Sequence, residues 1–162
     1  MEALAADPTT IFIGYNLKNG SKCYGTMVDV PEYQIIEMPV AEALMAGMAT
    51  GMALSGMKPV LIFERQDFML LSSDQIINHL DKINVLSHGQ FNPKVIIRAI
   101  VGYDKPFDPG LQHKGNFTHL FEQYCSFPVY NCTDEVTLSN AYKEALNPQS
   151  SVMIAEYRGL YQ

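Results

Sequence analysis

The sequence predicts an α/β fold with three layers, α/β/α, built around a mainly parallel sheet. Short runs rich in β-branched residues alternate with segments of helical spacing. Strands that alternate with helices form parallel sheets covered on both faces. The chain has 162 residues, of which 48% are hydrophobic, which is enough for one domain with a substantial core. We therefore expect a single domain over residues 1–162.

The strands are predicted from apolar runs of strand length that are rich in Val, Ile, Phe and Tyr. These runs are TIFIGY (10–15), YQIIEM (33–38), PVLIF (59–63), KVIIRAIV (94–101), FPVYN (127–131) and VMIAEY (152–157).

The first helix is predicted over residues 39–55 or 41–55, with Gly56 as its C-cap. It consists mostly of Ala, Met, Gly and Leu, and its one acid, Glu42, stands at its start. The uncharged stretch 43–57 is shorter than the roughly 20 residues that a bilayer span needs, so we expect a buried helix. Its small residues suit either tight packing on the sheet or a subunit interface, and both alternatives stay open.

Three further helical segments complete the pattern. One is predicted to start near Ser72 or Ser73, and another at Thr133. A short piece covers residues 116–124, and the Pro- and Gly-rich segment 102–115 is predicted as a loop after a strand. The apolar faces of the two longer helices are expected to consist of Ile76, Ile77, Leu80, Ile83 and Leu86, and of Leu138, Ala141, Tyr142 and Ala145.

Charge and cysteine content exclude several classes of function. The net charge of −6 and the scattered Lys and Arg residues give no basic surface for nucleic acid or an anionic membrane. Cys23, Cys125 and Cys132 form an odd set without a C-x-x-C pair, which suits buried thiols in a reducing compartment. The N-terminus lacks a basic flank before an apolar core, so we expect a cytoplasmic protein without a targeting segment.

Common catalytic motifs are absent from the sequence. No G-x-G-x-x-G follows a strand, and there is no Walker A or H-E-x-x-H sequence. His79 and His88 are nine residues apart, which does not place them on one helix face as metal ligands. No serine has the context of a nucleophile elbow. We expect no metal site on this chain.

Several longer motifs, taken in order, resemble a known family. They are IIEMPVAEALMAGMATGMALSGMKPVLIF, DFMLLSSDQIIN, GLQHKGNF and SVMIAEYRGLY. In order and spacing they resemble the pyrimidine-binding domain of the thiamine diphosphate-dependent 2-oxo acid dehydrogenase β subunits and, more distantly, transketolase. The resemblance covers roughly residues 10–160, and it implies the thiamine diphosphate-binding fold.

The resemblance implies a role for Glu42. In that family a glutamate after a strand and a turn hydrogen-bonds the aminopyrimidine ring of the cofactor. By sharing a proton with the ring it favours the tautomer that activates the thiazolium carbon. Glu42 in MPVAEA matches this glutamate. Without the resemblance, a glutamate at a helix start would be expected only to complement the helix dipole in solvent.

The resemblance assigns three further residues. Phe68 matches the aromatic residue against the pyrimidine ring, and Val40 lines the same pocket. His113 in LQHKG matches a loop histidine of the substrate channel, which suits proton transfer or contact with substrate because its pKa lies near working pH. The expected catalytic residues are thus Glu42 and His113, and the expected cofactor-binding residues are Val40, Glu42 and Phe68. From the residues alone, Phe68 is core and His113 is a solvent-exposed loop residue.

Departures from the family leave the substrate open. The first strand continues as GYNL where the family has an acidic GED pattern, and FERQDF carries Glu64, Arg65 and Asp67 where the family is less charged. The loop 102–115 places Asp104, Lys105 and Asp108 near the expected channel mouth. The 2-oxo acid, the acceptor and the role of this loop therefore do not follow from the sequence.

The sequence ends where a β subunit would continue into a C-terminal domain, and it lacks the family's G-D-G…N pattern for magnesium and diphosphate. The resemblance therefore implies a separate α-like subunit that holds Mg²⁺ and the diphosphate, in an α2β2 assembly. The expected function is a split thiamine diphosphate enzyme that decarboxylates a 2-oxo acid and transfers the acyl or aldehyde unit. The alternatives are a split transketolase, a non-catalytic subunit that keeps the fold, and a flavodoxin-like flavin-binding domain.

Overall fold

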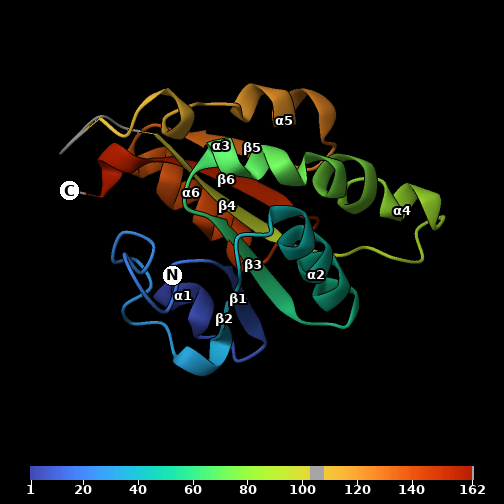
Figure 1. Ribbon diagram of the computed structural model, residues 1–162. Coiled ribbons are helices and arrows are strands. Elements are labelled where there is room, and N and C mark those ends of the chain that lie inside the picture. The colour runs from blue at the N-terminus through green and yellow to red at the C-terminus, as the bar shows by residue number, and fades with distance from the viewer. Residues whose placement is uncertain (103–107, 162) are drawn as a thin grey trace.

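The fold is a six-stranded, all-parallel sheet between two layers of helices (Figure 1). It is seen in a computed structural model that describes residues 1–102 and 108–161. The strand order is β2-β1-β3-β4-β6-β5, and each neighbouring pair is parallel. The strands are β1 (Thr10–Gly14), β2 (Ile35–Glu37), β3 (Lys58–Phe63), β4 (Ile96–Val101), β5 (Val129–Cys132) and β6 (Val152–Tyr157). All six predicted strands are confirmed, and so is the predicted α/β/α class.

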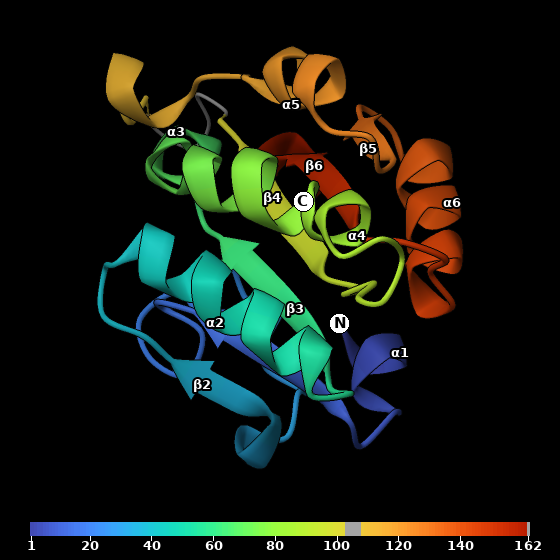
Figure 2. The same cartoon turned by 90° about the vertical axis from the view of Figure 1, so that its right-hand side faces the viewer.

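The helices form two layers because each buries one apolar face against the sheet. One core lies under α2, α3 and α5, and the other lies under α1 and α6. Figure 2 shows α2 beside the helical stretch that runs from α3 to α4, on the face toward the viewer. The helical elements are α1 (Glu2–Ala5), η1 (Glu32–Gln34), α2 (Glu42–Leu54), α3 (Gln66–Met69), η2 (Leu70–Ser72), η3 (Gln75–Leu80), α4 (Ile83–Leu86), η4 (Leu111–His113), α5 (Thr118–Tyr124), α6 (Glu135–Leu146) and η5 (Arg158–Leu160). Within the described ranges, no helix has the length and apolar character of a membrane span.

The strand order places a topological switch point between β1 and β3. From β1 the chain moves outward to β2, and then returns through α2 to pair β3 with the other side of β1. In open parallel sheets, ligands bind in the crevice outside the carboxyl ends of the strands at such a point. The segments that follow β1 and β3, together with the start of α2, therefore define where a ligand site is expected.

Two predictions about helices need correction. The second helix starts at Gln66 rather than near Ser72, and it contains a π-helical segment, Gln75–Leu80. A π-turn takes about one more residue than an α-turn. The side chains after it therefore face other directions than a continuous α-helix would give them. Leu86 is consequently 73% exposed, and the carboxylate-bearing Asp81 is buried instead. The helix predicted from Thr133 begins at Glu135, with Asp134 as a side-chain cap in a capping box with Thr137.

The first predicted helix is buried on one face only. Met45, Ala46 and Ala49 pack on the sheet, whereas Leu44 and Leu54 are 54% and 43% exposed.

Of the three cysteines, Cys23 and Cys132 are buried and Cys125 is half-buried, and all are free thiols.

Candidate functional site

The candidate site is formed by Glu42, Tyr15, Phe68 and His113 at the carboxyl edge of the sheet. Tyr15 follows β1, Glu42 is the first residue of α2, and Phe68 lies in α3 directly after β3. Tyr15, Glu42 and Phe68 are therefore held by elements that end or begin at the switch point, whereas His113 belongs to η4, which follows β4. Three of these residues, Glu42, Phe68 and His113, were predicted from the sequence, and their roles in cofactor or substrate binding remain predictions.

Glu42 is a buried carboxylate, with only 4% of the residue exposed. Its Oε1 atom accepts a hydrogen bond of 3.4 Å from the Tyr15 hydroxyl. The first turn of α2 has no side-chain cap among the described residues, so the carboxylate lies beside unpaired N–H groups at the positive end of the helix dipole. Burial raises the pKa of Tyr15, and the neighbouring Glu42 carboxylate raises it further, so Tyr15 stays a neutral hydrogen-bond donor.

Phe68 connects the buried carboxylate to the loop histidine. Its half-buried ring lies edge-on to Tyr15, with centroids 6.4 Å apart, and edge-on to His113 at 5.4 Å. Edge-to-face contacts of this kind fix the relative orientation of aromatic rings. A continuous line of side chains therefore runs from Glu42 through Tyr15 and Phe68 to His113.

His113 is the last residue of η4 and is half-buried. Its backbone carbonyl accepts a hydrogen bond of 3.0 Å from Arg65 Nη1. Of the loop charges predicted at the channel mouth, Asp104 and Lys105 lie outside the described residues. Asp108 accepts from the backbone N–H of Gly110 at 2.9 Å and forms an ion pair with Lys114 at 2.8 Å.

Val40 is 72% exposed and stands two residues before Glu42, in the turn between β2 and α2. Its apolar side chain is therefore accessible beside the helix that carries the carboxylate. The role of Val40 in a ligand site stays a prediction. Within the described ranges, no cluster of three or more His, Cys, Asp or Glu side chains could hold a metal ion.

The sequence prediction did not include Tyr15 among the site residues. The sequence did carry one indication of Tyr15: at the carboxyl end of the first strand it has GYNL where the family has an acidic GED pattern. The same turn is shaped by Glu37, whose carboxylate accepts backbone N–H bonds of 2.6 Å from Asn16, 2.9 Å from Leu17 and 2.7 Å from Lys18. These bonds hold the backbone that follows β1, and they thereby place the Tyr15 ring beside Glu42.

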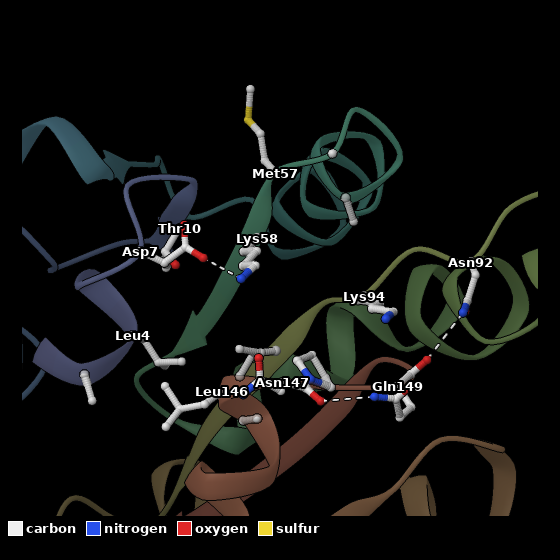
Figure 3. A pocket seen from close by; sticks show the side chains of 16 residues that line it. Leu4, Asp7, Thr10, Met57, Lys58, Asn92, Lys94, Leu146, Asn147 and Gln149 are labelled. Carbon is white, nitrogen blue, oxygen red and sulfur yellow. Dashed lines mark hydrogen bonds and ion pairs between the residues drawn. The ribbon is translucent and has the colours of Figure 1, made fainter.

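A cavity of about 400 Å³ lies at the opposite end of the sheet (Figure 3). It is lined by residues at the amino ends of β1, β3 and β4, and by the ends of α2 and α6. Lys58 forms an ion pair with Asp7 there, and Asn92 donates a hydrogen bond to the carbonyl of Gln149 at 3.3 Å. None of the four candidate site residues lines this cavity. This cavity is at the amino edge of the sheet, whereas ligands of parallel sheets bind at the carboxyl edge.

The fold, with a buried carboxylate at its switch point, is that of a parallel α/β domain whose ligand site is expected at the carboxyl edge of the sheet. The chain belongs to the family described as the transketolase pyrimidine-binding domain, whose model matches residues 1–162. This family is part of thiamine diphosphate-dependent enzymes.

Curated relatives are β subunits of the pyruvate dehydrogenase E1 component. The chain is 24% identical over 165 residues to subunit beta-3 from the chloroplast of Oryza sativa subsp. japonica, covering 99% of this chain and 42% of that protein. It is 24% identical over 164 residues to the subunit from Cyanidium caldarium, covering 99% of this chain and 50% of that protein. The chain thus spans about half the length of these relatives, or less.

A solved structure described as a split gene transketolase, an inactive beta4 tetramer, has the same fold. It aligns with a TM-score of 0.74 at 18% identity, covering 97% of this chain and 48% of that chain. At this level of identity the likeness establishes the fold alone.

Proposed function

We propose that this chain is the pyrimidine-binding, glutamate-bearing subunit of a split thiamine diphosphate-dependent enzyme that decarboxylates a 2-oxo acid and transfers the acyl or aldehyde unit. The observation that carries the proposal is the Glu42 carboxylate, which is 4% exposed, lies at the switch point and accepts a hydrogen bond from Tyr15. The relatedness to pyruvate dehydrogenase E1 β subunits supports the 2-oxo acid chemistry.

The residues of this chain would act on one ring of the cofactor. Thiamine diphosphate, when bound, supplies an electron sink for cleavage of the bond next to a carbonyl group. Glu42 would hold or share a proton with a ring nitrogen of the aminopyrimidine, and Phe68 and Val40 would cover the faces of that ring. His113, linked to Phe68 by the ring contact, would contact the substrate or move a proton at its carbonyl oxygen.

A partner subunit would complete the site. Val40 and Leu44 are exposed apolar side chains on either side of Glu42, at 72% and 54%, and such surface beside a buried carboxylate suits contact with another polypeptide. In this proposal a separate α-like subunit supplies the diphosphate half and holds Mg²⁺, and the assembly is α2β2. The single domain of residues 1–162 would then contribute only the pyrimidine half.

A split transketolase, which moves a two-carbon ketol unit between sugars, is the second candidate. The observation that favours it is the match of residues 1–162 to the family described as the transketolase pyrimidine-binding domain. Turnover of ketose phosphates with an aldose acceptor, in place of a 2-oxo acid, would establish it. A complex that binds thiamine diphosphate but turns over neither class of substrate would establish a non-catalytic subunit.

The test is titration of thiamine diphosphate with Mg²⁺ into the chain alone and into the complex formed on co-expression with a neighbouring reading frame. We expect saturable binding to the complex and essentially none to this chain alone, because a half-site loses most of the contacts. Tight binding of flavin to the isolated chain, with no response to thiamine diphosphate in the complex, would refute the proposal.

A further inference from the structure

Four consecutive residues, Arg65 to Phe68, hold the loop that carries His113. Arg65 Nη1 donates to the His113 carbonyl at 3.0 Å. The Asp67 carboxylate accepts from the Gly115 N–H, at 3.2 Å to each oxygen. Phe68 then contacts the His113 ring edge-on. We call these contacts, together with those of Gln66 described next, the 65–68 clamp.

Gln66 is the buried centre of the clamp. It is 0% exposed, its Oε1 accepts from the Phe117 N–H at 2.6 Å, and its Nε2 donates to Thr118 Oγ1 at 3.1 Å. Both ends of the carboxamide are therefore satisfied by the segment that follows the loop and begins α5. A buried amide with both functions paired fixes its partners, because breaking either bond leaves a desolvated polar group.

The clamp arises from a change of backbone conformation after β3. Arg65 is extended, with φ −140° and ψ 132°, and Gln66 starts the short helix α3. In helical geometry successive side chains point about 100° apart. Neighbouring residues in the sequence therefore reach different atoms of the same loop, rather than alternating across the sheet as in a strand.

Two glycines let the loop come this close. A Cβ on Gly115 would lie 2.8 Å from Asp67 Oδ1, and it would also overlap the Phe117 ring. A Cβ on Gly102, at the end of β4, would overlap the backbone of Lys114. Residues 113–115 thus lie against the end of β4 on one side and against the clamp on the other.

We propose that Arg65, Gln66 and Asp67 are positioning residues that hold the His113 ring against Phe68. The contacts bracket His113: its own carbonyl is held by Arg65, and the amide two residues later is held by Asp67. The backbone bonds fix where the His113 side chain begins, and the edge-on contact with Phe68 orients its ring. The relevance to catalysis rests on the proposed function, whereas the positioning itself is a property of this chain.

The test uses nuclear magnetic resonance on the labelled full-length chain, without cofactor or partner. Two quantities are measured: the hydrogen-exchange rate of the Gly115 amide, and the chemical shifts of the His113 ring protons, which report the nearby Phe68 ring. In Asp67→Ala we expect the Gly115 amide to exchange at least tenfold faster and the His113 shifts to move toward those of an unstructured peptide. Asp74→Ala, which removes an exposed carboxylate farther along the same helical stretch, should change neither.

Two further variants keep the test decisive. Phe68→Leu should move the His113 shifts while leaving Gly115 exchange unchanged, because it removes the ring and keeps the carboxylate. Arg65→Gln, at a half-buried position, should move the His113 shifts even if Asp67→Ala fails to fold. Wild-type exchange at Gly115 in folded Asp67→Ala, or unchanged His113 shifts in Arg65→Gln, would overturn the proposal.

A measurement in the assembled complex separates positioning from cofactor binding. If the proposed function holds, Asp67→Ala should lower kcat/KM for the 2-oxo acid at least tenfold and change the Kd of thiamine diphosphate less than twofold, because Glu42 is untouched. Failure of the complex to bind the cofactor would refute the proposed function and leave the clamp standing. If the resonance measurements contradict the expected changes, the positioning role of the clamp is refuted and the cofactor proposal is unaffected.

Discussion

At the scale of single residues, the central feature is a carboxylate held almost entirely out of water. Burying Glu42 costs free energy unless the charge is compensated. The Tyr15 hydroxyl and the N–H groups of the first turn of α2 supply part of that compensation. The 3.4 Å distance makes the tyrosine bond a long one, so the carboxylate keeps capacity for a further donor. An aminopyrimidine ring nitrogen that carries a proton is such a donor.

Replacing Tyr15 by Phe should lower the free energy of unfolding by about 1 kcal/mol, because the buried carboxylate loses its hydroxyl donor and the ring is kept. Urea denaturation of the isolated chain measures this change. Tyr33→Phe is the matched control, since Tyr33 is 76% exposed, and it should change stability negligibly. Equal effects of the two variants would mean that the Tyr15 hydroxyl does not stabilise the site.

At the scale of elements, α2 has two different faces. Its inner face packs Met45, Ala46 and Ala49 on the sheet, and its outer face exposes Leu44. A Cβ added to Gly51 would meet nothing within 4 Å. Tight packing on the sheet therefore does not explain this glycine, and a subunit interface remains the proposal for the outer face.

In the isolated chain, Gly51→Ala should raise the free energy of unfolding by about 1 kcal/mol, because alanine costs less backbone entropy inside a helix and no atom opposes its methyl group. Thermal or urea unfolding measures the change. Gly14→Ala provides the contrast, because its Cβ would lie 2.7 Å from the Ile62 carbonyl oxygen, and that variant should be destabilised. A destabilised Gly51→Ala would show that the outer face is more crowded than the structure indicates.

The elements also show how far sequence patterns reach. Short apolar runs rich in β-branched residues predicted every strand, because such side chains pack well on the buried surface of a pleated sheet. The π-helical segment Gln75–Leu80 could not be predicted, since no residue type indicates an extra residue in a helical turn. The burial of Asp81, directly after this segment, was therefore not predicted either. Glu42, Phe68 and His113 were predicted as site residues through motif order, and their roles remain predictions. Tyr15 and the 65–68 clamp depend on contacts between segments distant in sequence, which one sequence does not contain.

At the scale of the whole molecule, a buried ion pair joins distant parts of the chain. Arg98 of β4 and Glu156 of β6 are each 1% exposed, and Arg98 Nη2 lies 2.9 Å from Glu156 Oε2. Tyr142 of α6 and Tyr161 also donate to the Glu156 carboxylate. Burial alone would lower the pKa of Arg98, but the Glu156 carboxylate holds it well above its usual range. The network therefore stays charged, and it ties the C-terminal segment to the centre of the sheet.

Glu156→Gln should lower the free energy of unfolding by about 3 kcal/mol, because it leaves the Arg98 guanidinium buried without its counter-charge. Glu122→Gln, which changes an exposed glutamate of α5, is the control and should have little effect. Urea denaturation of both variants measures the difference. A Glu156→Gln protein as stable as the control would mean that the ion pair contributes no net stability.

The most direct test of the account is the turnover of the assembled complex with Glu42→Gln in this chain. We predict a loss of at least 100-fold in kcat with the complex intact, because glutamine keeps the shape but cannot hold or share the proton. Glu135→Gln is the matched control, since Glu135 is also a glutamate at the first position of a helix but is exposed, and it should keep full turnover. Wild-type turnover in Glu42→Gln would contradict the central claim that this buried carboxylate acts on the cofactor.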